Sequence, residues 1–211
     1  YVEENSEAAF AELVQNHLDF VYTSALRRVG GDAQLAEDVA QHVFVALARA
    51  AASLAQRPVL VGWLYNTTRF AAAQVVRSER RRRAREQQAH LMNELTSASA
   101  HDAEWERLRP VLDDTMDALN AHDREAVLLR FFENRSFAEV GAKLQLGENA
   151  ARMRVERALD KLQALLARRG VTSTTTALGL ALANQSVVAA PAGLGATVTG
   201  TVLASGAVAG G

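Results

Sequence analysis

The chain has 211 residues, 49% of them hydrophobic, and a formal net charge of −1. This length allows one large or two small domains, each with a buried core. The absence of cysteine excludes disulfides and thiolate metal sites and, with no secretory signal at the start, favours a cytoplasmic location. Aromatic residues make up only 6%, and alanine and leucine are frequent, which favours helices over sheets.

The segment from Phe10 to Pro58 predicts two amphipathic helices. Apolar residues from Phe10 to Leu26 recur at spacings of three and four, as on one face of a helix. Gly30 and Gly31 are expected to end this helix, and Asp32 suits the N-cap of the next one. The apolar stripe of the second helix consists of Leu35, Val39, Val43 and Leu47.

A third helix is expected from Pro58 into a cluster of arginines. Residues 77–85 contain six arginines and one glutamate in a chain that is otherwise nearly neutral. This local excess of positive charge indicates binding to a polyanion. The aromatic residues Trp63, Tyr65 and Phe70 precede the cluster, which suggests contacts with bases as well as phosphates. Trp63 itself, at the start of the helix, is expected to pack inward.

Two segments lack the helical pattern. Residues 91–110 include a string of small polar residues and are interpreted as a flexible linker. Residues 171–211 contain no charged residue and are rich in Ala, Gly, Thr and Val. They are compatible with a disordered linker, with short helices that pack on the domains or on a partner, and with a lead into a membrane segment beyond residue 211. The tail has no run of about 20 strongly apolar residues, and we expect a partly helical regulatory extension.

Residues 111–170 predict a second domain with a helix-turn-helix. Ser136 and Glu139 form a capping box for a short helix that ends near Leu144. Gly147 is a tolerable N-cap for a longer helix, whose first turns would enter a DNA major groove. Its inward stripe would be Val155, Leu159, Leu162 and Leu166. A solvated arginine face on an ordinary helical hairpin is the alternative.

Four segments, taken in order, resemble the sigma-70 family of RNA polymerase sigma factors, in its extracytoplasmic function (ECF) group. The resemblance covers about residues 10–169. The segments are a polymerase-binding helix at 36–44, a promoter-melting helix that begins at 62–64 and ends in the arginines, the opening helix of the last domain at 119–132, and the helix-turn-helix at 136–166.

The resemblance implies an all-α fold of two small helical domains. Residues 1–90 would form the region 2 helical bundle, which binds core polymerase and recognises and melts the −10 element. Residues 111–170 would form the region 4 helix-turn-helix, which recognises the −35 element. The flexible linker at 91–110 joins them, and the Ala/Gly-rich tail at 171–211 follows.

The resemblance also implies roles for individual residues. Those matched to polymerase binding are Glu37, Asp38, Gln41 and Phe44. Those matched to −10 DNA are Asn66, Thr67, Arg69 and Phe70, with Arg77, Arg80, Arg81 and Arg83 as phosphate contacts. Those matched to −35 DNA are Asn149, Arg152, Met153, Arg154 and Arg157.

The chain departs from the family pattern within the −10 helix. Many members carry asparagine after the arginine that matches Arg69, and an acidic residue a few positions later. Here these positions are Phe70 and Gln74. The resemblance therefore leaves the preferred −10 sequence open.

The implied partners are promoter DNA and core RNA polymerase, contacted at the clamp helices of its largest subunit and the flap of its second-largest subunit. An anti-sigma factor, or self-regulation by the tail, is a further expectation. The resemblance implies no catalytic residue, no metal, no cofactor and no small-molecule substrate. The protein would be cytoplasmic and associated with the nucleoid when active, and a membrane tether beyond residue 211 is compatible with the tail.

Two other functions remain open from the sequence. A stand-alone helix-turn-helix regulator would use its N-terminal domain to dimerise and would bind two-fold symmetric DNA. A metal enzyme could use Asp38 and His42, which lie four residues apart on a helix. The five histidines are scattered, however, and no metal cluster, glycine-rich phosphate loop or nucleophile motif is evident.

Overall fold

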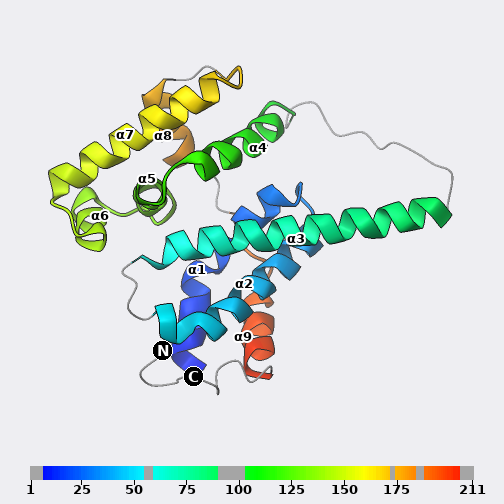
Figure 1. The fold of residues 1–211 in the computed structure, drawn as a ribbon. Helices are drawn as coiled ribbons and strands as arrows, with labels where there is room; N and C mark the ends of the chain where they lie inside the picture. Colours follow the sequence, from blue (N-terminus) through cyan, green and yellow to red (C-terminus); the bar gives the residue numbers. More distant parts are fainter. Residues whose placement is uncertain (1–6, 55–58, 90–102, 172–173, 184–187, 205–211) are drawn as a thin grey trace.

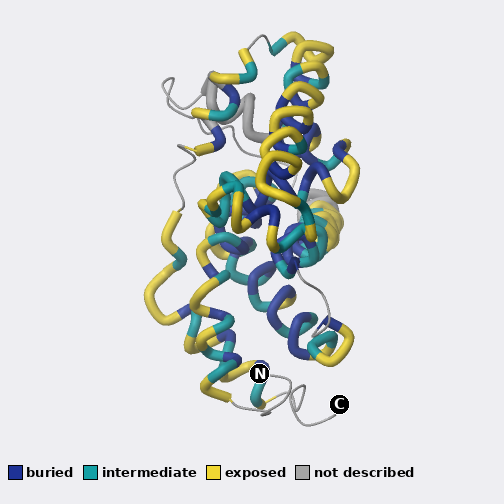
Figure 2. Tube along the Cα trace, turned by 90° about the vertical axis from the view of Figure 1, so that its left-hand side faces the viewer, coloured by how far each residue is buried: buried dark blue, intermediate teal, exposed yellow. Residues whose placement is uncertain are grey.

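The computed structural model describes residues 7–54, 59–89, 103–171, 174–183 and 188–204. Every regular element in these ranges is a helix (Figure 1), which confirms the predicted all-α class. Buried and exposed positions alternate along the helices (Figure 2), as amphipathic sequences require. None of the helices in these ranges is both long enough and apolar enough to cross a membrane.

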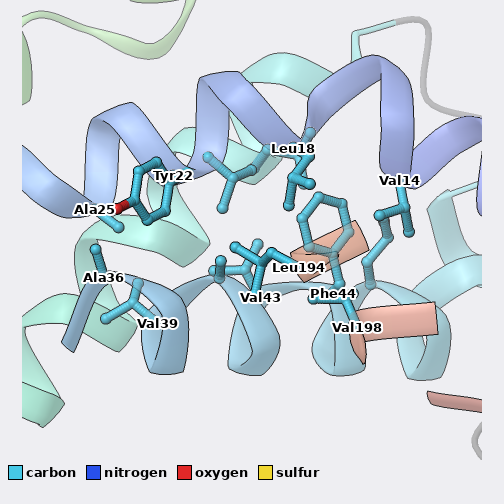
Figure 3. Packing of buried hydrophobic residues seen from close by; sticks show 14 of the residues in the cluster. Val14, Leu18, Tyr22, Ala25, Ala36, Val39, Val43, Phe44, Leu194 and Val198 are labelled. Carbon is cyan, nitrogen blue, oxygen red and sulfur yellow. The ribbon is translucent and has the colours of Figure 1, made fainter. Parts of the chain in front are cut away.

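The first bundle consists of α1 (Glu7–Arg28), α2 (Ala33–Leu54) and α3 (Leu60–Ala89). As predicted, Gly30 and Gly31 follow α1, with positive φ angles of 74° and 84°. The Asp32 carboxylate then accepts a 3.1 Å hydrogen bond from the backbone amide of Leu35 at the start of α2. Apolar side chains of α1 and α2 interdigitate in the core of this bundle (Figure 3).

The second bundle follows the segment 90–102, which lies outside the described residues. The prediction of a linker at 91–110 is wrong for residues 103–110, because these residues belong to a helix. The bundle consists of α4 (Ala103–Ala118), α5 (Ala121–Val127), the π-helical turn η1 (Leu128–Phe132), α6 (Phe137–Leu144) and α7 (Glu148–Ala167). Its core includes the predicted inward stripe of α7, and all four residues of that stripe are buried.

The predicted capping box and tight turn shape the helix-turn-helix of α6 and α7. The Ser136 hydroxyl accepts a 3.3 Å hydrogen bond from the Glu139 amide, and the Glu139 carboxylate accepts a 2.8 Å bond from the Ser136 amide. Gln145 takes up a left-handed conformation with φ of 57°. The Leu146 amide then donates a 2.8 Å bond to the Gly141 carbonyl, which turns the chain back into α7.

The tail forms two helices, α8 (Thr175–Ala183) and α9 (Leu194–Ala204). Helix α8 packs on α7 and η1, whereas α9 packs on α1 and α2 (Figure 1). The expectation of a partly helical extension is confirmed for these two segments. Of the three interpretations of the tail, packing on the protein's own domains fits them.

The two bundles also pack against each other. The start of α3 contributes Val61 and Tyr65, both fully buried, to the hydrophobic core of the second bundle. Gly62 lies between them, and a side chain at this position would meet the Glu125 side chain at 2.8 Å. The sequence predicted two domains joined by a linker, but it did not predict this interface.

Gly141 offers a test of the helix-turn-helix packing. A β-carbon at Gly141 would lie 2.6 Å from the Leu146 carbonyl oxygen, which is backbone and cannot move aside. Gly141→Ala should therefore destabilise the second bundle by about 2 kcal/mol, despite the better helix propensity of alanine. Gly147→Ala is the control, because its β-carbon would meet nothing within 4 Å, and it should cost about 0.5 kcal/mol as a poorer N-cap. Thermal unfolding followed by circular dichroism measures both, and equal losses would contradict this packing.

Candidate nucleic-acid interface

The N-terminal half of α7 presents the residues predicted to read DNA. Arg152 and Met153 have exposed fractions of 50% and 49%, and Asn149 and Arg157 are also exposed. Arg154 is half-buried. Since Met153 is exposed, it does not fill a gap in the core. The structure therefore brings the predicted −35 residues together on one end of one helix.

Arg152 is held in place by a neighbour that the sequence analysis missed. Its guanidinium carbon lies 4.8 Å from the centroid of the Phe137 ring, and Arg130 lies 5.0 Å from the same ring. Glu148 is 3.9 Å from the Arg152 guanidinium. Cation–π contacts at exposed sites contribute about 0.5–1 kcal/mol, enough to favour one orientation of Arg152. The only signal in the sequence was an aromatic residue directly after the capping serine.

Helix α3 presents a different kind of surface near its middle. Phe70 is 64% exposed, whereas Asn66 and Thr67 are half-buried. The Arg69 guanidinium lies 5.2 Å from the Phe70 ring centroid, and its Nε is 3.2 Å from the Asp117 carboxylate of α4. An exposed aromatic ring beside a cation is a suitable platform for an unstacked base.

The other two aromatic residues of α3 do not share this surface. Trp63 packs against the core of the first bundle, as predicted. Tyr65 has no exposed surface and lies in the core of the second bundle. The suggestion that Tyr65 faces bases is therefore wrong for this structure, and Phe70 is the aromatic residue of that set that is exposed.

The arginine cluster lies along the exposed C-terminal half of α3. Arg77, Arg80 and Arg81 are exposed, and the Arg81 Nε donates a 3.3 Å hydrogen bond to the Arg77 carbonyl. Arg82 forms a 2.9 Å ion pair with Glu79 on the preceding turn. Arg83 follows on the same helix, but its side chain lies outside the described residues. The described arginines form a basic stripe that leads away from Phe70.

The residues predicted to bind polymerase are divided between the surface and the core of the first bundle. Glu37, Asp38 and Gln41 are half-buried on α2. Phe44 has no exposed surface, and Figure 3 shows it between Leu18 of α1 and Val198 of α9. In this structure, the polar residues of α2 are therefore accessible to a partner and Phe44 is not.

The pair Asp38 and His42 shows no sign of a metal site. The His42 Nδ1 lies 2.7 Å from the backbone carbonyl oxygen of Asp38, a contact within one helical turn. No group of three potential metal ligands occurs among the residues that the structure describes. The described residues therefore add no third ligand to this pair.

A buried charge cluster joins the two bundles beside the part of α3 that carries Arg69. Arg27 at the end of α1 forms a 3.3 Å ion pair with Asp113 of α4, and Arg28 forms a 3.2 Å pair with Asp117. The Tyr65 hydroxyl donates a 3.0 Å hydrogen bond to Asp117. Burial raises the pKa of the Tyr65 hydroxyl, so it remains protonated and can donate. The side chains of both arginines are about 10% exposed or less.

This charge cluster is not evident from the sequence. Arg27 and Arg28 occupy the last turn of α1, where basic residues are common because they complement the helix dipole. Asp113 and Asp117 lie four residues apart and therefore on one face of α4. Nothing in the sequence showed that these two pairs would meet across the interface.

Comparison with known proteins identifies both bundles. Residues 13–82, which include most of α1, all of α2 and most of α3, match Sigma-70 region 2, and residues 115–164 match Sigma-70 region 4. The chain is 32% identical over 164 residues to the RNA polymerase sigma factor CarQ of Myxococcus xanthus, covering 77% of this chain and 92% of that protein. The chain belongs to the sigma-70 family, in its ECF group.

A second relative agrees with this assignment. The ECF RNA polymerase sigma factor SigE of Mycolicibacterium smegmatis is 30% identical over 172 residues, which cover 79% of this chain and 65% of that protein. The chain is thus a sigma factor that directs transcription initiation. Neither family match extends into the tail, because the match to Sigma-70 region 4 ends at residue 164.

Two aspartates of α4 provide a test of the buried charge cluster. Asp117→Asn leaves Arg28 buried without its closest negative partner, and should destabilise the protein by roughly 3 kcal/mol. Asp114→Asn removes an exposed partner of Arg169, and should cost less than about 1 kcal/mol. Urea unfolding of the two variants measures the difference. Similar losses would show that the cluster is not a stabilising contact between the bundles.

Proposed function

We propose that this sigma factor reads the −35 element with α7, captures unstacked −10 bases with α3 and binds core RNA polymerase through α2. The observation that carries the proposal is the pair of exposed basic surfaces, one on each family region. One consists of Arg152 and Arg157 at the start of α7, and the other is the stripe from Phe70 to Arg81 on α3. In this role the protein works in the cytoplasm, on the nucleoid when active.

The two DNA surfaces suit different forms of DNA. The exposed arginines of α7 lie outside its buried stripe, so this helix can enter a major groove while its buried face stays packed. Arginine there can bind guanine O6 and N7, and Met153 offers an apolar contact such as a thymine methyl. On α3, the exposed Phe70 ring offers a stacking surface, which suits a base that has left the duplex.

Contacts with the polymerase would use other surfaces. The acidic edge formed by Glu37, Asp38 and Gln41 on α2 fits a basic partner, here the clamp helices of the largest subunit. The second bundle would lie at the flap of the second-largest subunit. An anti-sigma factor would have to compete for one of these surfaces. No small-molecule substrate is part of this proposal.

A stand-alone helix-turn-helix regulator would bind duplex DNA without polymerase. In vitro transcription with purified core polymerase and a randomised promoter library separates the two functions. The sigma factor proposal predicts promoter-dependent transcripts that share two sequence elements. A protein that does not bind core polymerase, but binds duplex DNA tightly as a dimer, would contradict the proposal.

The arginine stripe should grip the DNA backbone without choosing its sequence. Arg80→Ala combined with Arg81→Ala removes two exposed cations, so open-complex formation should weaken to a similar degree at every promoter. The log–log salt dependence should become shallower by about 1.4, since each phosphate contact on single strands contributes roughly 0.7. Permanganate footprinting of several promoters across a salt series measures both. A change in which promoters are chosen would contradict this role.

Phe70 should act at the bases instead. Phe70→Leu keeps an apolar side chain but removes the ring, and loss of one stacking contact should weaken binding to a pre-melted promoter by about tenfold. Phe70→Tyr is the control, because it retains the stacking surface. Filter binding of the holoenzyme to fork-junction DNA measures both variants. Unchanged affinity of Phe70→Leu would exclude Phe70 as a stacking platform.

A further inference from the structure

We propose that α8, α9 and residues 188–193 before α9 act as an intramolecular strap that holds the two bundles in a closed state, in which Arg69 of the proposed −10 surface is paired with Asp117 of the other bundle and initiation is slowed. The strap is defined here as the described residues 175–183 and 188–204. Its closing effect follows from contacts within this chain. Its consequence for promoter reading rests on the function proposed above.

One end of the strap is attached to the second bundle. Leu178 and Leu182 of α8 are 5% and 1% exposed and belong to its hydrophobic core. Gly179 lies between them, where a β-carbon would be 3.7 Å from Leu159 of α7. The Thr175 hydroxyl lies 2.9 Å from the Gln163 side-chain oxygen, again on α7. Helix α8 is therefore an integral part of the second bundle.

The other end is attached to the first bundle. The Thr23 hydroxyl donates a 3.0 Å hydrogen bond to the Val188 carbonyl, and lies 3.0 Å from the Val188 amide. The Ala190 amide donates a 2.9 Å bond to the Asp19 carboxylate on α1. Helix α9 then adds three buried side chains to the core of the first bundle: Leu194, Val198 and Val202. Figure 3 shows Leu194 and Val198 against α1 and α2.

Chain length limits how far the bundles can separate while both ends stay attached. Five Cα–Cα steps join Ala183 to Val188, and they can span at most about 17 Å in any conformation. A compact bundle of roughly 80 residues has a radius of about 15 Å. While both ends of the strap stay attached, the centres of the two bundles can therefore lie at most roughly 50 Å apart, even when every other contact between the bundles is broken.

The spacing of the promoter elements favours a wider separation of the bundles. The −10 and −35 elements are centred about 25 base pairs apart, which is on the order of 80 Å of duplex. The other connection, from Ala89 to Ala103, has 14 steps and can reach about 45–50 Å, so with the two radii it allows close to 80 Å. The strap, rather than this connection, therefore sets the tighter limit on how far the bundle centres can separate. Detachment of one of its ends would allow the wider arrangement and would free Arg69 from Asp117.

Two leucines of α8 provide a matched test. Leu182 is 1% exposed and Leu180 is 59% exposed on the same helix. Leu182→Asp should detach α8 by placing a charge in the core, whereas Leu180→Asp should leave it attached. Val198→Asp tests the other end of the strap independently, on the other bundle. Circular dichroism confirms that each variant keeps its helical content, so that detachment is distinguished from unfolding.

The readout is the distance between the bundles in the full-length protein. Spin labels at Arg49→Cys on α2 and Glu156→Cys on α7 are specific, because the chain has no cysteine and both sites are exposed. The measurement is made in an Asp117→Asn background, in which the direct interface is weakened. With the strap intact, pulsed dipolar spectroscopy should give one short distance. Leu182→Asp and Val198→Asp should each raise the ratio of open to closed molecules at least about tenfold, since tethering acts through effective concentration.

Each result either supports or overturns the strap. Unchanged distances in both variants, or an equally open Asp117→Asn protein with the strap intact, would overturn it. The initiation rate with core polymerase should rise in the detached variants and not in Leu180→Asp, and a rise in opening without faster initiation would overturn the inhibitory role. Failure of every variant and of the unmodified protein to bind core polymerase would instead contradict the proposed function. The distance measurement does not depend on polymerase.

Discussion

The arrangement of this sigma factor depends on the buried contact between the end of α1, the start of α3 and helix α4. Two arginines of α1 form ion pairs with two aspartates of α4, and the Arg28 guanidinium also lies 4.9 Å from the centroid of the Tyr65 ring. Removing one charge of such a buried set costs far more than removing an exposed one, because the remaining charge stays desolvated. The contact therefore favours a defined closed arrangement of the two bundles.

This contact also involves a DNA-binding candidate. Arg69, next to the exposed Phe70, forms a 3.2 Å ion pair with Asp117, which also binds Arg28 and Tyr65. In the closed state a cation of the proposed −10 surface is thus partly neutralised by the other bundle, whereas the proposed −35 surface on α7 remains exposed. Opening would free Arg69 and allow the bundles to separate. Promoter reading and domain separation would in this way be coupled through one aspartate.

The sequence predicted features that depend on local chemistry. The capping box at Ser136, the N-cap at Asp32 and the inward stripe of α7 are all present, because each depends on residues a few positions apart. Contacts between distant segments could not be predicted in this way. The burial of Tyr65, the charge cluster and the attachment of α9 depend on which amphipathic faces meet, and periodicity alone does not determine that. The start of α4 was missed because its first residues adjoin a polar string typical of a linker.

The central claim is that this sigma factor is closed when free and must open to direct initiation. The most direct measurement is the distance between labels at Arg49→Cys and Glu156→Cys, in the otherwise unmodified protein, alone and in complex with core polymerase and promoter DNA. The account predicts one short distance in the free protein, and an increase of several tens of ångströms in the initiation complex, where the promoter elements lie about 80 Å apart. The same short distance in an active initiation complex would contradict it.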